Sequence, residues 1–131
     1  LSAVGGLHPG DASRLFSVFD SPAAGAICYE IADGSSLALA AAEGADWLLS
    51  IANLDPYPLQ LQQQFLALAQ LRAIESGRDL LSVANTGPTA LISADGHVER
   101  LLPPMQAGLA KVTVQRRQAI SFYSWLVSKS R

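Results

Sequence analysis

The side chain best suited to covalent chemistry is the single cysteine of the chain, Cys28. It stands in an apolar run over residues 26–31 that predicts a strand, and a predicted helix follows this run. At a strand-to-helix transition a side chain can project from the sheet edge, and backbone N–H groups can face a developing oxyanion. The position therefore suits a nucleophile. The alternative, that Cys28 is a small residue of the core, stays open on the residues alone.

Two further polar residues could serve the same site. Glu30 lies two residues after Cys28, on the same face of the predicted strand, where its carboxylate could orient a catalytic partner or tune the thiol. Asn53 follows another apolar run, residues 47–51, at a place where α/β proteins gather the polar groups of their binding sites. An ordinary strand carboxylate and a loop cap are the structural alternatives for these two residues.

Metal and nucleic-acid chemistry are disfavoured by the residue counts. His8 and His97 have no other ligand type at helical spacing, so we expect both at the surface, with no metal ion and no cofactor. Nine Lys and Arg against eleven Asp and Glu give a net charge of -2. Apart from the adjacent Arg116 and Arg117, which we expect on a solvated turn, these charges are scattered, so we expect no nucleic-acid partner.

The composition indicates one folded domain. Of 131 residues, 50% are hydrophobic and 15% are charged, which is enough apolar surface to offset the entropy of ordering the chain. No run of about 18 apolar residues occurs, so the sequence predicts no transmembrane segment within it. The chain opens on Leu1 and closes beyond a semi-apolar stretch at residues 119–127, and we interpret both ends as cuts in a longer parent.

The elements that would position Cys28 begin with a predicted hairpin. Its strands are residues 15–20 and 26–31, and a turn over residues 21–25 joins them. An alanine-rich helix follows, for which Asp33 or Ser35 is the expected N-cap. This order places a helix directly after the cysteine strand.

The middle of the chain predicts a strand, a loop and a long helix. Residues 47–51 are continuously apolar, a pattern typical of a strand that is covered on both faces. Residues 53–58 contain two prolines and form a rigid loop. Apolar residues then recur at spacings of three and four, which predicts a helix of about five turns with Gly77 as its C-terminal cap.

The last third predicts four strands in succession. They cover residues 79–84, 89–93, 97–102 and 109–114. The predicted order is therefore ββαβαββββ. Helices between the early strands favour an α/β layered domain, with an antiparallel edge contributed by the last strands.

Several motifs together carry a resemblance to one family. Residues 27–30 read ICYE, residues 71–78 read LRAIESGR and residues 85–90 read NTGPTA. In these motifs the chain resembles the apolipoprotein N-acyltransferases of the carbon–nitrogen hydrolase (nitrilase) superfamily, from about Pro9 to Tyr123. It departs from them where residues 32–34 replace a Phe-Pro pair and where residues 53–57 replace an Asn-Asp-x-Trp-Phe loop.

The resemblance implies a fold and a set of site residues. Residues 1–131 would be the C-terminal half of a nitrilase-like α-β-β-α sandwich, and the first half and the membrane-spanning segments would lie upstream. Of the family's Glu–Lys–Cys triad only Cys28 carries over, because no lysine precedes Lys111. Glu30 would take a supporting role, and Tyr29 would contribute its backbone N–H to the oxyanion site. The structural alternative for Tyr29 is that its ring simply packs against the neighbouring layer.

Four other residues of the matched motifs are expected to be structural. Asn85 and Thr89 fit backbone hydrogen bonding at a strand turn. Arg72 and Arg78 flank the Gly77 cap and fit a buried-pair or helix-end role better than anion capture.

The function that the resemblance implies is transfer of an acyl chain from a phospholipid, through a Cys28 thioester, to the N-terminal amine of a lipoprotein. The parent would sit in the bacterial inner membrane through segments outside this chain, with its catalytic domain on the periplasmic side. Two alternatives stay open: a soluble nitrilase-like amidase or carbamoylase, and an inactive interaction module of the same fold. The 131 residues alone are expected to be inactive and to self-associate.

Overall fold

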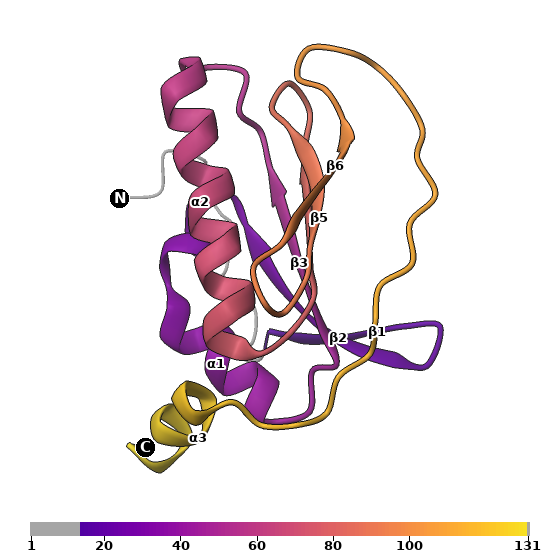
Figure 1. Cartoon of the computed structure of the whole chain (residues 1–131). Coiled ribbons are helices and arrows are strands. Elements are labelled where there is room, and N and C mark those ends of the chain that lie inside the picture. The colour runs from indigo at the N-terminus through magenta and orange to yellow at the C-terminus, as the bar shows by residue number, and fades with distance from the viewer. Residues whose placement is uncertain (1–13, 131) are drawn as a thin grey trace, which may run out of the picture.

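The structure, a computed structural model, describes residues 14–130. One six-stranded mixed sheet carries its helices on one face (Figure 1). The elements are β1 (Leu15–Val18), β2 (Ser21–Ile27), the 3₁₀ helix η1 (Cys28–Ala32), α1 (Gly34–Ala42), β3 (Trp47–Ala52), α2 (Leu59–Ser76), β4 (Leu80–Ala84), β5 (Thr89–Ile92), β6 (Val98–Leu102) and α3 (Phe122–Lys129).

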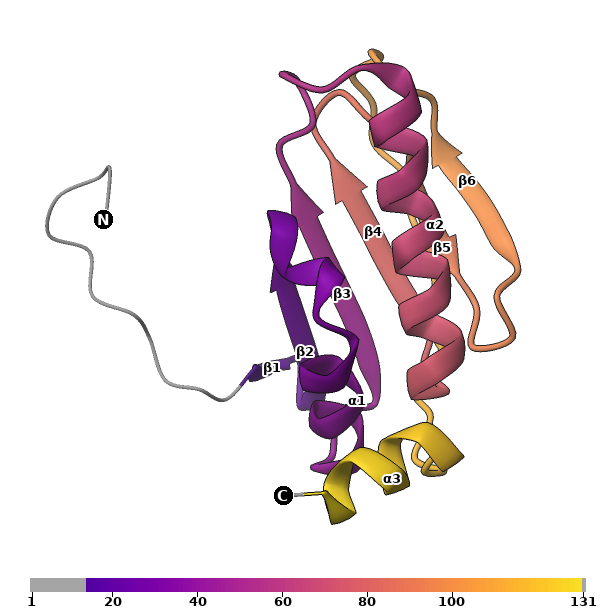
Figure 2. The same ribbon diagram turned by 90° about the vertical axis from the view of Figure 1, so that its left-hand side faces the viewer.

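The strand order brings three carboxyl ends to one edge of the sheet. The strands are arranged β1-β2-β3-β4-β5-β6, and β2, β3 and β4 run parallel, whereas β1, β5 and β6 pair antiparallel to their neighbours. Helices α1 and α2 connect the parallel strands, as Figure 2 shows. The predicted α/β layered class is confirmed, and residues that follow β2, β3 and β4 lie side by side.

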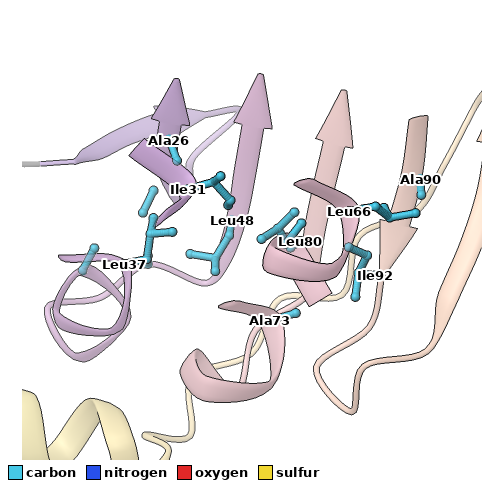
Figure 3. Packing of buried hydrophobic residues seen from close by; sticks show 13 residues of the cluster. Ala26, Ile31, Leu37, Leu48, Leu66, Ala73, Leu80, Ala90 and Ile92 are labelled. Carbon is cyan, nitrogen blue, oxygen red and sulfur yellow. The ribbon is translucent and has the colours of Figure 1, made fainter. Parts of the chain in front are cut away.

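The core lies between this sheet and the two connecting helices (Figure 3). Helix α2 turns a stripe at spacings of three and four toward the sheet, formed by Leu66, Ala69 and Ala73. Small side chains let the helices approach the strands closely. The buried cluster comprises Ala24, Ala26, Ile31, Leu37, Ala40, Ala45, Leu48, Leu66, Ala69, Ala73, Leu80, Ala90 and Ile92.

The opposite face of the sheet is only partly covered by the described residues. In β3, Leu48 and Ser50 are buried, whereas Ile51 is 49% exposed. Ile51 pairs with Ile27, which is 68% exposed. The prediction that residues 47–51 are covered on both faces is therefore wrong for this part of the chain. We call the surface formed by Phe16, Ile27, Trp47, Leu49 and Ile51 the open sheet face.

The hairpin is confirmed, but its turn lies elsewhere than predicted. Val18 pairs with Ser21, so Phe19 and Asp20 alone form the turn, and both have positive φ. A two-residue turn of this kind matches the twist of the flanking strands. The predicted turn at residues 21–25 is therefore part of β2, and the cysteine strand ends at Ile27 instead of residue 31.

The helices between the strands agree with the sequence. The Asp33 carboxylate accepts the Ser36 N–H at 3.1 Å and caps α1, and Gly77 ends α2 with a left-handed φ of 62°. Among the described helices none is long and apolar enough to cross a membrane.

The last third agrees only in part. Strands β4, β5 and β6 are confirmed, whereas residues 109–114 form no strand, because β6 is the last strand of the sheet and they pair with no other. These residues belong instead to a strap, residues 103–120, that leads to α3, which the sequence analysis did not predict. Ser124 of α3 is fully buried, and Figure 2 shows α3 lying across the end of α1.

Candidate active site

Cys28 is the first residue after β2 and the first of η1. Its φ of 54° lies in the left-handed region, which residues with a Cβ avoid. Such strain is found where a strand turns sharply to present a nucleophile. The side chain is partly buried. The predicted strand-to-helix setting is confirmed, although the strand ends at Ile27 and the cysteine lies in the turn that follows it.

The carboxylate of Glu30 stabilises this turn. Its Oε2 accepts the backbone N–H of Ile27 at 2.8 Å and lies 3.0 Å from Nη1 of Arg14. The Ile27 N–H, more than any other contact, lowers the pKa of Glu30, with the Arg14 guanidinium adding to the effect against partial desolvation. The expected placement of Glu30 and Cys28 on one strand face is wrong, because residues 28–32 coil into a 3₁₀ helix.

The same turn leads directly into the cap of α1. Asp33 donates its backbone N–H to the Glu30 carbonyl at 3.0 Å, and its carboxylate accepts from Ser35 and Ser36. The hydroxyl of Ser36 is the main cause that lowers the pKa of Asp33. Two ionised carboxylates therefore lie beside Arg14, one in η1 and one at the start of α1.

Tyr29 follows the cysteine and exposes its ring. The side chain is 78% exposed, so the alternative that the ring packs against a neighbouring layer does not hold within the described residues. The reason is the 3₁₀ turn, which directs this side chain away from the core. Its backbone N–H belongs to the turn that begins at Cys28.

Asn53 lies at the end of the next parallel strand, as its place in the sequence predicts. Ile27 pairs with Ile51, so Cys28 and Asn53 follow neighbouring strand ends with a short offset. Asn53 Oδ1 accepts from Nδ2 of Asn85 at 2.7 Å and from the N–H of Asp55 at 3.1 Å. The amide oxygen of Asn53 therefore caps its loop, which is the structural alternative for this residue.

Asn85 joins the loops that follow β3 and β4. Its Oδ1 accepts the backbone N–H of Leu54 at 3.0 Å and that of Thr86 at 2.9 Å. The structural role expected for Asn85 is confirmed. Sequence reasoning missed the Asn53–Asn85 pair, although both residues follow parallel strands that are adjacent in the sheet.

A groove of about 580 Å³ adjoins the cysteine turn along the open sheet face. Its lining includes Arg14, Phe16, Ile27, Glu30, Leu49 and Ile51. The lining therefore combines the charged Arg14 and Glu30 with apolar side chains.

The two arginines of the second motif are structural, as expected. Arg72 is buried and pairs with Glu75 at 2.6 Å. Arg78 is 1% exposed and donates to the carbonyls of Ala45 and Ala119 at 2.6 Å. Its burial lowers the pKa of the guanidinium.

Metal ligands do not gather in the part of the chain that the structure describes. Within residues 14–130 no three His, Cys, Asp or Glu side chains are placed to share an ion. His97 is exposed, and His8 lies outside the described residues. Arg116 and Arg117, expected on a solvated turn, instead pair with the buried Asp46 and Asp79.

The comparisons with known proteins agree with this geometry. Residues 6–123 match the family model described as carbon-nitrogen hydrolase. The chain belongs to the carbon–nitrogen hydrolase family. Solved structures support the fold: an amidase from Nesterenkonia sp. superposes with a TM-score of 0.65 at 18% identity, over 91% of this chain and 45% of that chain. A CN-hydrolase superfamily protein from Xanthomonas campestris gives 0.57 at 17% identity, over 70% and 40% of the two chains.

Among sequence relatives, the similarity is to apolipoprotein N-acyltransferases. The enzyme of Parasynechococcus marenigrum (strain WH8102) is 69% identical over 97% of this chain, and that of Prochlorococcus marinus (strain MIT 9313) is 59% identical over 95%. The resemblance found in the motifs is thereby confirmed. The chain spans 27% and 25% of the lengths of these two relatives.

Proposed function

We propose that the intact protein is an N-acyltransferase that moves a fatty acyl chain from a phospholipid to the N-terminal amine of a lipoprotein. The observation that carries the proposal is the left-handed Cys28 directly after β2, in a chain 69% identical to a relative of that name. A strained strand-to-helix turn is the geometry that presents a nucleophile to an ester carbonyl.

The reaction proceeds in two acyl transfers. The Cys28 thiolate attacks the ester carbonyl of the phospholipid, and the tetrahedral oxyanion collapses to a thioester with departure of the lysophospholipid alkoxide. A general acid protonates the alkoxide. The lipoprotein amine then attacks the thioester, loses a proton to a general base, and the thiolate leaves.

Each residue around Cys28 has a distinct part in this scheme. The Tyr29 N–H donates to the oxyanion, because it is the first amide after the nucleophile in the turn. Glu30 is ionised and occupied by Ile27 and Arg14, so it holds the turn and exchanges no proton. Asn53 lies at the neighbouring strand end and contacts the substrate through its amide NH₂, since its Oδ1 already accepts two hydrogen bonds.

The remaining parts come from outside these residues. The glutamate and lysine of the triad, the first half of the α-β-β-α sandwich and the membrane segments lie upstream, and the open sheet face packs against that first half. The catalytic domain lies on the periplasmic side of the bacterial inner membrane, where phospholipid and lipoprotein meet.

The first prediction tests the nucleophile. In the full-length protein incubated with phospholipid, we expect an acyl adduct on Cys28 by mass spectrometry, and none at this position in Cys28→Ala, because the alanine has no thiol. Ser82→Ala, a change within β4, is the control and should keep the adduct. A covalent acyl intermediate that still forms in Cys28→Ala would refute the assignment.

The product of the reaction shows whether the acyl chain is transferred to an amine or to water. With a lipopeptide present, the N-acylated peptide is expected. Free fatty acid without N-acylated peptide would indicate the hydrolytic alternative, a nitrilase-like amidase or carbamoylase that shares the fold of the solved amidases. A Cys28 that forms no adduct in the full-length protein would indicate the inactive interaction module.

A further inference from the structure

We infer that Arg14 is a positioning residue for Cys28, acting through the carboxylate of Glu30. The inference rests on the proposed function, because it explains how the nucleophile of that reaction is held. Arg14 lies 14 positions before the cysteine, just ahead of β1, and its side chain is 18% exposed.

The Arg14 guanidinium bridges three segments that meet at the cysteine turn. Nη1 donates to the Gly25 carbonyl of β2 at 3.2 Å and to Glu30 Oε2 in η1 at 3.0 Å. Nη2 lies 3.8 Å from Oδ2 of Asp33, the N-cap of α1. The strand before Cys28, the turn that contains it and the helix after it are therefore tied to one side chain.

Glu30 transmits this contact to the backbone beside the nucleophile. The same oxygen that Arg14 contacts, Oε2, accepts the Ile27 N–H at 2.8 Å. Half of the Glu30 side chain is exposed, so without Arg14 the carboxylate could turn toward water and release Ile27. The bond to Ile27 holds the backbone that enters Cys28.

A firm hold is needed because the conformation of Cys28 is unfavourable. A residue with a Cβ at φ 54° relaxes toward negative φ unless its surroundings oppose it. Relaxation would swing the thiol, and a displacement of about 1 Å from the attack geometry can cost about a hundredfold in rate. Arg14 thus contributes to turnover without touching the substrate.

Hydrogen exchange at the Ile27 amide tests the contact without any assay of activity. In the full-length protein, Arg14→Gln should raise the exchange rate of Ile27 roughly tenfold, the size expected for loss of one charge-assisted hydrogen bond. Arg100→Gln, which removes an exposed arginine from β6 at the far edge of the sheet, should leave the rate unchanged. An unchanged Ile27 rate in Arg14→Gln would overturn the inference.

A double-mutant cycle tests the route through Glu30. In the full-length protein, Arg14→Gln should lower the kcat of acyl transfer about tenfold with KM unchanged, and it should have no further effect once Glu30→Ala is present. Arg14→Lys should restore only part of the loss, because a single ammonium cannot span the same acceptors. Full additivity of the two changes, or a rise in KM alone, would contradict a positioning role.

The two measurements separate this inference from the proposed function. If Arg14→Gln speeds Ile27 exchange in a full-length protein that forms no acyl adduct, the acyl transfer is refuted and the contact from Arg14 through Glu30 to Ile27 stands. If the full-length protein forms the adduct but Arg14→Gln leaves Ile27 exchange unchanged, only the positioning role of Arg14 is refuted.

Discussion

One oxygen of the Glu30 carboxylate accepts the backbone N–H of Ile27, next to Cys28, and also a hydrogen bond from the Arg14 guanidinium. Both contacts favour the ionised form, which is why the pKa is lowered in the folded chain. The sequence assigned Glu30 to orienting a partner or tuning the thiol. In the structure its carboxylate stabilises the backbone that leads into Cys28.

The second prediction follows from the direction of this shift. Because the folded pKa of Glu30 is lowered below its ordinary value of 4.5, its stabilisation of the turn is complete above that value and is lost as pH falls through the folded pKa. The Ile27 amide should therefore lose protection on acidification in the unaltered chain. Hydrogen exchange measured between about pH 6 and about pH 3 checks this.

Glu30→Gln supplies the comparison at nearly constant shape. In this variant the Ile27 amide should exchange faster near neutral pH, and its protection from exchange should not fall further on acidification. In the full-length protein the variant should also turn over more slowly with the fold intact. An equal loss of Ile27 protection on acidification in both chains, or unchanged kinetics, would leave Glu30 as an ordinary surface carboxylate.

At the scale of elements, the end of the sheet opposite to Cys28 is organised by two buried carboxylates. Asp46 and Asp79 directly precede β3 and β4, and each side chain is 4% exposed. Arg116 binds Asp46 at 2.8 Å and Arg117 binds Asp79 at 3.1 Å. The strap is therefore fixed at the amino ends of the parallel strands, and α3 follows from there.

The third prediction concerns Asp79, which accepts backbone N–H groups of Ala94 and Gln115, each at 3.0 Å, besides Arg117. In Asp79→Asn an NH₂ group would face one of these donors, so we expect the free energy of unfolding to fall by about 1–3 kcal/mol. Urea denaturation measures this. Glu99→Gln, an exposed change on β6, should be neutral, and equal stability of the two variants would argue against the anchor.

The elements that followed from local patterns are those whose patterns reflect burial. The stripe of α2 and strand β5, all of whose residues are buried, have this property, whereas the Gly77 cap follows from its left-handed φ. Helix α3 has the reverse pattern: it buries Ser124, while Phe122 is 76% and Trp125 is 48% exposed. Its apolar side does not face the core, so periodicity alone could not orient it.

The end of β2 was missed for a different reason. Residues 26–31 are apolar enough for a strand, but the chain turns at Cys28 because Glu30 reaches back to Ile27 and also to Arg14, 16 positions away in sequence. Long-range contacts of this kind leave no local signal. The site residues could be named from motif and strand order, whereas their hydrogen bonds could not.

For the whole molecule, the open sheet face is the main exposed apolar surface beside the site. Ile27 and Ile51 are neighbours in β2 and β3, with Phe16 and Trp47 in edge-to-face contact further along. Contiguous apolar surface of this kind usually marks an interface.

The fourth prediction is that the isolated 131 residues self-associate through this face. Ile51→Ser should lower the mass measured by light scattering, because it removes apolar contact from the face. Ile74→Ser is a matched control, since Ile74 is also 49% exposed but lies on α2, on the other side of the sheet. A monomer at every concentration, or equal effects of both changes, would contradict the prediction.

The left-handed turn at Cys28 also bears on which residue can stand at this position. Glycine adopts a φ of 54° at no steric cost, so replacement of Cys28 by glycine would relieve about 1 kcal/mol of strain. Cys28→Gly should therefore leave the backbone of this turn intact, so that what the variant loses is the sulfur itself.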